Sequence, residues 1–278
     1  MTERRRELDL GRTQATRRAM IASNVKAIGA IAATALVASL AKPTPAMARA
    51  CFLRGTRIKT VLGEQNVEDL AIGDSLPTVF GGTRPIQWIT RYRHVKDDSS
   101  KPWKRQALPV RIVDSALAPN VPHTDLYVTP GHALFIDGLL VPAGSLINGT
   151  TISLYAADEY DELEFFQIKL EAHDVIYAEG APCESLLRVN EADSSFAEYR
   201  RACGIPEMPD RHCAPIVCNG AHSEIRSRAL SAISPWLGPQ KIDIIRDRLE
   251  ERAVMLLSVE QLSAALPKRH HLVEGAVS

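Results

Sequence analysis

The stretch CFLRGTRIKT, residues 51–60, stands at a junction in the chain. After its cysteine, Gly55 and Thr56 open a short alternation of apolar and polar residues that is typical of a strand. Before it lies PAMARA, residues 45–50, which ends in small residues of the kind that a signal peptidase cuts after. The chemistry of the chain therefore depends on whether Cys51 keeps a peptide bond before it or becomes a first residue.

Residues 1–50 follow the order of a secretory signal. A basic region containing Arg17 and Arg18 leads to an apolar stretch at 27–41 and then to the small residues. Paired arginines ahead of a weakly apolar segment resemble a twin-arginine signal, so we expect an exported protein, periplasmic or extracellular. The alternative is an amphipathic or disordered extension. No stable membrane span is expected, since a span needs about 20 apolar residues.

Two cleavage positions fit the small residues. A cut after Ala48 leaves a two-residue stub, whereas a cut after Ala50 makes Cys51 the N-terminus. Lipid attachment at the cysteine is not expected, because Ala48 stands where a lipid-attachment box has an apolar residue, usually leucine.

The charge of the chain is balanced overall but unevenly distributed. Its 278 residues include 33 basic and 33 acidic ones, and residues 1–50 hold nine of the former and three of the latter. A neutral chain with ordinary hydrophobicity is not, as a whole, a nucleic-acid binder, a disordered acidic protein or a multi-span membrane protein. Its length fits one substantial domain with extensions or two small domains.

From Thr56 to about Ala178 the pattern is β throughout, with short apolar runs separated by turn residues. Asp137-Gly138 predicts a type I′ hairpin, and residues 97–104 predict a polar surface loop. We expect a mainly β fold, a compact barrel or sandwich. The predicted strands are 57–61, 75–80, 84–93, 108–114, 126–128, 133–136, 139–141, 151–154, 165–170 and 175–178.

After Glu184 the pattern becomes helical. Residues 223–234 and 240–253 space apolar positions as helices do, and Ser258 with Gln261 predicts the start of another helix through a capping box. These helices are expected to pack on the β domain or on a partner subunit. The chain thus divides into a targeting segment at 1–50, a β domain at 51–187 and a helical extension at 188–278.

Three stretches together resemble the Hint domain, the module shared by hedgehog autoprocessing domains and inteins. They are CFLRGTRIKT from Cys51, YVTPGHALFI from Tyr127 and FFQIKLEAHDVIYAEG from Phe165. The bacterial branch is the most similar, through C-F-x-x-G-T, V-P-A-G-x-L-x-N-G at 141–149 and H-D-V-x-x-A-E-G at 173–180. The resemblance covers about residues 51–187 and the CAPIV run at 213–217. It implies a compact, horseshoe-like β fold with a small helical tail.

The resemblance also implies self-processing without a cofactor. In the family, the first cysteine attacks the carbonyl before it, which here makes Ala50–Cys51 the scissile bond, and a thioester replaces the amide. The T-x-x-H pair would be Thr129, which holds the scissile peptide, and His132, which acts as acid or base. The substrate would be the chain's own N-terminal segment, in a single turnover. Alone, Thr129 and His132 would suggest a turn with polar groups facing solvent.

The second step is left open by the sequence. His173 matches the histidine that supports C-terminal cleavage in inteins, but no His-Asn pair occurs, and Cys183-Glu184-Ser185 stands in its place. Complete splicing is therefore not expected. In hedgehog domains an upstream aspartate activates a sterol; Asp114 has a comparable place but is first a turn aspartate and second a general base. Water, a thiol or an amine would be the second nucleophile.

The remaining cysteines and histidines predict no metal site. Cys183, Cys203, Cys213 and Cys218 allow three disulfide pairings or buried thiols, and their spacing to His222 is not a standard zinc pattern. No nucleic-acid partner is expected. The main alternative to self-processing is an exported Hint-fold protein without catalysis, used as a scaffold or for binding.

Overall fold

A computed structural model describes residues 50–188, 200–201, 203–204, 211–217 and 240–265. The chain divides into two units, residues 1–42 and 43–278, and all described residues belong to the second. Predictions that fall on residues 1–49 and on the helix at 223–234 lie outside the described residues.

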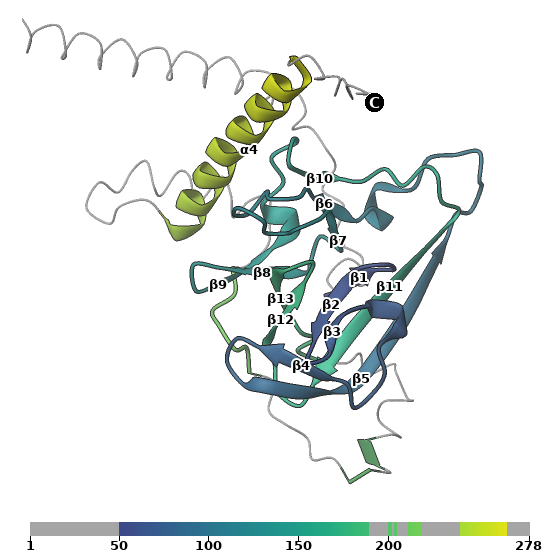
Figure 1. Cartoon of the computed structure of the whole chain (residues 1–278). Coiled ribbons are helices and arrows are strands. Elements are labelled where there is room, and N and C mark those ends of the chain that lie inside the picture. Colours follow the sequence, from purple (N-terminus) through teal and green to yellow (C-terminus); the bar gives the residue numbers. More distant parts are fainter. Residues whose placement is uncertain (1–49, 189–199, 202, 205–210, 218–239, 266–278) are drawn as a thin grey trace, which may run out of the picture. The chain divides into compact units, whose positions relative to one another are not determined.

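The second unit is built mainly from strands, which pair antiparallel in two sheets (Figure 1). One sheet has the order β10-β6-β7-β1-β11-β5-β4 and the other β3-β2-β12-β13-β8-β9. The prediction of a mainly β fold followed by a helical segment is confirmed. The strands are β1 (Phe52–Leu53), β2 (Arg57–Thr60), β3 (Gly63–Asn66), β4 (Ser75–Thr78), β5 (Gly82–Val95), β6 (Val110–Ile112), β7 (Leu126–Val128), β8 (Ala133–Ile136), β9 (Leu139–Pro142), β10 (Ile152–Leu154), β11 (Glu162–Leu170), β12 (Val175–Ala178) and β13 (Ala181–Glu184). The helices are η3 (Val67–Asp69), η4 (Arg105–Ala107), η5 (Ala143–Ser145) and α4 (Lys241–Ala265).

The longest pairing, between β5 and β11, runs along the seven-stranded sheet. It extends from Glu162 opposite Val95 to Leu170 opposite Ile86. β11 is buried over most of its length, because β1 pairs with its other edge and the core covers it. β11 therefore gives the two-residue strand β1 a buried neighbour to pair with in the same sheet.

The hairpin between β8 and β9 confirms the turn predicted at Asp137-Gly138. Both residues have positive φ, 51° and 81°, and Ile136 pairs directly with Leu139. Two left-handed residues in succession match the type I′ geometry that Asp-Gly favours.

Three strands were not predicted. β1 has only two residues, and β13 contains none of the β-branched residues that mark strands. β3 is polar and exposed, since it forms an edge of its sheet. The turn between β2 and β3 lies at residues 61–62, and Gly63 and Glu64 already pair with β2.

α4 corrects the prediction of a helix starting at Ser258. The helix continues through this residue, whose hydroxyl donates to the Val254 carbonyl oxygen one turn back at 2.7 Å. Its Ile242, Ile245 and Leu249 join the main hydrophobic core, as the helical spacing predicted. No helix among the described residues is long and apolar enough to cross a membrane.

Candidate active site

Cys51 lies directly before β1, next to the end of β7. Phe52 pairs with Val128, so the residues flanking this pair, Cys51 and Thr129, also meet. The Thr129 amide donates to the Cys51 carbonyl oxygen at 3.0 Å, and the Cys51 amide donates to Thr129 Oγ1 at 3.1 Å. Since the Cys51 N–H belongs to the Ala50–Cys51 peptide bond, Thr129 contacts the predicted scissile bond itself.

The turn after β1 explains the glycine and threonine of the C-F-x-x-G-T start. Gly55 has a φ of +87°, a conformation that side chains strongly disfavour. Its amide donates to Glu68 Oε2 at 2.8 Å, and the Thr56 hydroxyl donates to the Leu53 carbonyl oxygen at 2.7 Å. These contacts fix where β1 ends, and thereby the position of Cys51 directly before this strand.

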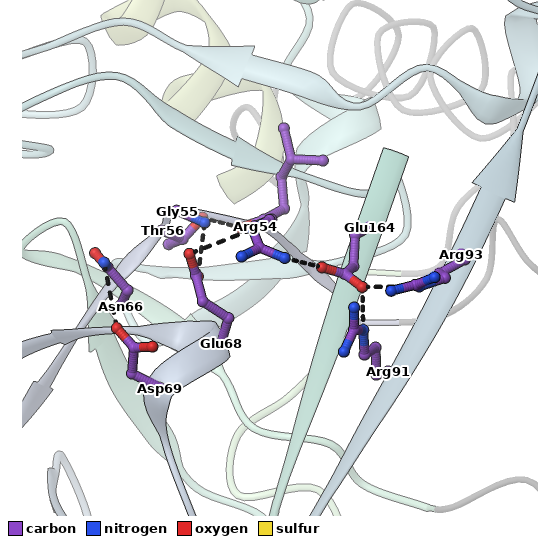
Figure 2. Close-up of polar contacts among 10 residues, drawn as sticks. Arg54, Gly55, Thr56, Asn66, Glu68, Asp69, Arg91, Arg93 and Glu164 are labelled. Atoms are coloured by element: carbon purple, nitrogen blue, oxygen red, sulfur yellow. Dashed lines mark hydrogen bonds and ion pairs between the residues drawn. The ribbon is translucent and has the colours of Figure 1, made fainter. Parts of the chain in front are cut away.

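A second set of contacts ties this turn to the sheet (Figure 2). Arg54 Nη1 donates to Glu164 Oε2 at 2.6 Å, while Arg91 and Arg93 donate to the other oxygen of the same carboxylate. Burial acts to raise the pKa of Glu164, but the three arginines outweigh it, so its pKa lies below the ordinary 4.5. The sequence did not single out this network, because its members come from the turn after β1 and from β5 and β11.

His132 lies fully buried between β1 and β13. Its Nε2 donates to the Glu184 carbonyl oxygen at 3.1 Å, so the neutral ring carries its proton on Nε2 and Nδ1 has a free lone pair. Among the described residues Nδ1 has no hydrogen-bond partner. The ring also stacks at a tilt on Phe52, with 4.3 Å between centroids.

Burial lowers the pKa of His132 below 6.5. The Glu184 charge and the main-chain atoms of Cys51 and Glu184 favour the protonated ring, and His173 disfavours it. A neutral imidazole with one bare nitrogen can accept a proton and return it, as a general acid-base group must.

The loop that presents His132 is held by the V-P-A-G segment. The Gly144 amide donates to the Pro130 carbonyl oxygen at 2.9 Å, and the Ala143 amide to the His132 carbonyl oxygen at 2.8 Å. A Cβ on Gly144 would lie 3.0 Å from the Pro130 carbonyl oxygen, so the close approach favours glycine. The V-P-A-G segment therefore holds the T-x-x-H loop in position.

His173 lies buried just before β12 and contacts two other segments. Its Nδ1 accepts from the Cys213 amide at 3.0 Å, and its Nε2 is 3.4 Å from Glu184 Oε2 without hydrogen-bond geometry. His212 lies edge-on to its ring, with 5.3 Å between centroids. The contact with Cys213 explains why the CAPIV run accompanies the β domain.

Asp174, the next residue in the chain, has a structural role. One carboxylate oxygen accepts from the Phe80 and Val175 amides at 3.0 and 2.8 Å, and the other accepts from Arg84 at 2.9 Å. These bonds fasten the β4–β5 turn to β12.

Glu184 is the site residue that sequence reasoning missed. Besides the carbonyl that binds His132, its Oε1 accepts from the Ala133 amide at 2.8 Å. The sequence noted Glu184 only as part of the tripeptide that replaces His-Asn. No local pattern could identify its role, because its partners are about fifty residues away.

The Cys51 side chain faces a small apolar cluster. Cys51 is 3% exposed and packs with Trp103, Ala157 and Phe165. Trp103 donates from Nε1 to the Ala157 carbonyl oxygen at 3.0 Å. The segment at 97–104 was predicted to be a polar surface loop, and most of it is exposed, but its tryptophan is buried over this cluster.

The structure does not bring Asp114 close to Thr129. β6 runs antiparallel to β7 with Val110 opposite Val128, so Asp114 follows the end of β6 away from Thr129. Four residues of strand correspond to roughly 13 Å. Asp114 is exposed, and its carboxylate accepts from the Ser115 hydroxyl at 2.7 Å, which fits a turn residue.

Within the described part of the chain, no group of three or more His, Cys, Asp or Glu side chains has the arrangement of a metal site. Cys183, Cys203 and Cys213 are free thiols there. Burial raises the pKa of the Cys183 thiol, and it raises that of Cys213 to about 11. Cys218, His222 and the Arg17-Arg18 pair lie outside the described residues.

Comparisons with known proteins give one family and several solved structures. The sequence model described as Hint domain matches residues 50–190. No curated protein matches the chain. The gp41-1 intein is 13% identical over 48% of this chain and 97% of its own, with a TM-score of 0.34. A DnaB intein from Synechocystis sp. PCC 6803 is 10% identical over 49% of this chain and 98% of its own, with a TM-score of 0.34. A bacterial intein-like domain from Clostridium thermocellum is 14% identical over 48% of this chain and 96% of its own, with a TM-score of 0.33.

Proposed function

The chain belongs to the Hint domain family, and we propose that it processes itself by an N–S acyl shift at Cys51. The observation that carries the proposal is the hydrogen bond from the Cys51 amide to Thr129 Oγ1 at 3.1 Å, next to a buried histidine with a bare nitrogen. The substrate is the chain's own segment before Cys51. The products are a thioester first and a shortened chain afterwards.

In the first step the Cys51 thiol loses its proton to His132 Nδ1. Sγ then attacks the Ala50 carbonyl carbon, and a tetrahedral intermediate forms with negative charge on the carbonyl oxygen. Thr129 keeps the scissile peptide in place through the hydrogen bond that its Oγ1 accepts from the Cys51 amide. The bare Nδ1 supports this assignment, because Nε2 is already bound to the Glu184 carbonyl.

In the second step the C–N bond breaks. His132 returns its proton to the Cys51 nitrogen, which leaves as a neutral amine, and Ala50 is held as a thioester on Sγ. No net proton is gained or lost. Because an amide is more stable than a thioester, this equilibrium needs a following reaction to proceed.

That following reaction is transfer of the Ala50 acyl group to water, a thiol or an amine. Attack on the thioester carbon releases residues 1–50 and restores the Cys51 thiol. Complete splicing is not proposed, since the chain has no His-Asn dipeptide and no asparagine is available beside His173 or Glu184 to cyclise.

We further propose that residues 1–50 form a twin-arginine export signal and that the protein works in the periplasm or outside the cell. Arg17-Arg18, the apolar stretch and the small residues before Cys51 support this. The C-F-x-x-G-T, V-P-A-G and H-D-V motifs support the bacterial branch of the family, with the domain at 51–187 and the extension at 188–278. The end of the signal and the start of the domain then share the Ala50–Cys51 bond.

A scaffold or binding protein without catalysis is the second candidate, and the burial of Cys51 favours it. Among the described residues, Cys51 is 3% exposed and packs in the cluster with Trp103, which shields it from an incoming nucleophile in this conformation. Signal peptidase cleavage after Ala50 would also remove the acyl group before it could react.

The test replaces residues 1–45 with a reporter domain and keeps residues 46–50. Incubation with dithiothreitol should release the reporter from the fusion, and substitution of Cys51→Ala should abolish this release. His132→Ala should slow it by about 10²-fold or more, the usual contribution of a general acid-base group. A fusion that stays intact, or one that is cut equally in both variants, would contradict self-processing and leave the scaffold.

A further inference from the structure

Glu184 contacts both histidines of the site. Its carbonyl oxygen accepts from His132 Nε2 at 3.1 Å, and its carboxylate Oε2 lies 3.4 Å from His173 Nε2. The other carboxylate oxygen accepts from the Ala133 amide at 2.8 Å. One residue of β13 therefore reaches one histidine through its main chain and the other through its side chain.

We propose that Glu184 is a positioning residue that keeps the bare Nδ1 of His132 turned toward Cys51 and stabilises the imidazolium with its carboxylate. The proposal rests on the proposed function and adds to it the residue that governs the acid-base group. The charge would act at the moment when His132 holds the proton taken from the thiol.

The Glu184 carbonyl oxygen fixes the tautomer of His132. A carbonyl oxygen only accepts, so it fixes the proton on Nε2 and leaves Nδ1 as the nitrogen that can take another. The ring is completely buried, and in the described part of the chain Nδ1 is unpartnered. Leaving a buried polar atom without a partner is costly, which makes this nitrogen a candidate for reaction rather than for structure.

The Glu184 carboxylate differs from the other buried glutamates in its partners. Within the described residues, Glu184 has no lysine or arginine partner, whereas Glu164 and Glu179, which are equally buried, both bond arginines. A buried carboxylate without a cation is expensive to maintain. This cost falls when a positive charge forms nearby, and the Glu184 charge favours protonation of His132.

Among the described residues, few titratable groups face His132. They are Glu184 on β13, His173 before β12 and Cys51 before β1. Burial lowers the pKa of His132, and His173 lowers it further, while the Glu184 charge acts in the opposite direction. Removing that charge should therefore weaken His132 as a base.

The experiment compares the full chain with its Glu184→Gln variant. A glutamine keeps an oxygen for the Ala133 amide and keeps the main-chain carbonyl for His132, but it removes the charge. We measure how fast dithiothreitol releases residues 1–50 as a function of pH. The variant should react about tenfold more slowly on the plateau, and its acid midpoint should move down by about one pH unit, the size of a single nearby charge.

Glu179→Gln is the matched control. Glu179 is also buried and lies on the same β12–β13 hairpin, but it bonds Arg57 rather than a site histidine. It should lower stability and leave the acid midpoint unchanged. If Glu184→Gln slows release with the same midpoint as the wild type, its role is only structural and the proposal is wrong.

A readout that needs no activity separates this proposal from the proposed function. In the full chain with Cys51→Ala, the ring nitrogen chemical shifts of His132 should show a protonated Nε2 and a bare Nδ1. The added Glu184→Gln change should lower the pKa of that ring. A proton on Nδ1, or an unchanged pKa, would overturn the positioning role. Failure of the wild-type chain to release its segment would overturn only the proposed function.

Discussion

Replacing Thr129 by valine removes the acceptor of the Cys51 amide while keeping the shape of the side chain. Cys51 and Thr129 are both buried, 3% and 8% exposed, so water does not take the place of the lost hydroxyl. A buried N–H without a partner costs about 1–3 kcal/mol. The free energy of unfolding of Thr129→Val should fall by that amount, and the melting temperature by roughly 2–4 °C for each kcal/mol.

The assay is urea unfolding of the full chain in a Cys51→Ala background, which prevents processing. Thr129→Ser keeps the hydroxyl and should lose less than about 1 kcal/mol, since only a methyl group is removed. Thr60→Val is the control: the Thr60 hydroxyl accepts from the Leu62 amide and donates to the Gly63 carbonyl oxygen, but both residues are exposed, Leu62 to 87%, so water can replace these bonds. If Thr129→Val is as stable as Thr129→Ser, the hydrogen bond to the scissile amide does not contribute as we infer.

Three further predictions follow from the same contacts. Burial lowers the pKa of His132, so as the pH falls below 6.5 the unfolded chain takes up a proton that the native chain does not. Until the pH reaches the native pKa, this difference should lower the free energy of unfolding by about 1.4 kcal/mol per pH unit. His132→Gln should therefore lose stability less steeply than the wild type in an acid titration below pH 6.5. Because the pKa of Glu164 is lowered in the native state, its ionised carboxylate stabilises the fold above pH 4.5, and this contribution is lost as the pH falls through the native pKa. Glu164→Gln should therefore have a lower melting temperature than the wild type at neutral pH and approach it in strong acid. Trp103→Ala should destabilise the chain by about 3 kcal/mol and speed labelling of Cys51 by a thiol reagent at least tenfold. An unchanged labelling rate would show that Trp103 does not cover the thiol.

The sequence predicted well where local chemistry determines the backbone. The Asp137-Gly138 hairpin follows from two residues that tolerate positive φ, and β7, β8 and β12 have the predicted bounds because their apolar residues are flanked by turn residues. The proximity of Cys51 to Thr129 and His132 came from the family resemblance rather than from any pattern within the three motifs.

Elements that depend on distant contacts were not predictable. β13 is a strand because β12 and β8 pair with it, not because of its own residues. Likewise Glu184 meets His132 across 52 residues, and its sequence context gives no sign of this. Asp114 was expected first as a turn aspartate and second as a general base, and the antiparallel register of β6 and β7 carries it away from Thr129, which fits the turn.

The most direct test of an acyl shift at Cys51 is to trap the thioester with hydroxylamine and weigh the released fragment. The full chain, purified with residues 1–50 attached, should yield an N-terminal fragment whose mass ends in an Ala50 hydroxamate and a second fragment that begins at Cys51. The Cys51→Ala variant should yield neither. A fragment that ends elsewhere, or one with a free carboxylate at Ala50 in both chains, would show cleavage by another route and contradict a thioester at Cys51.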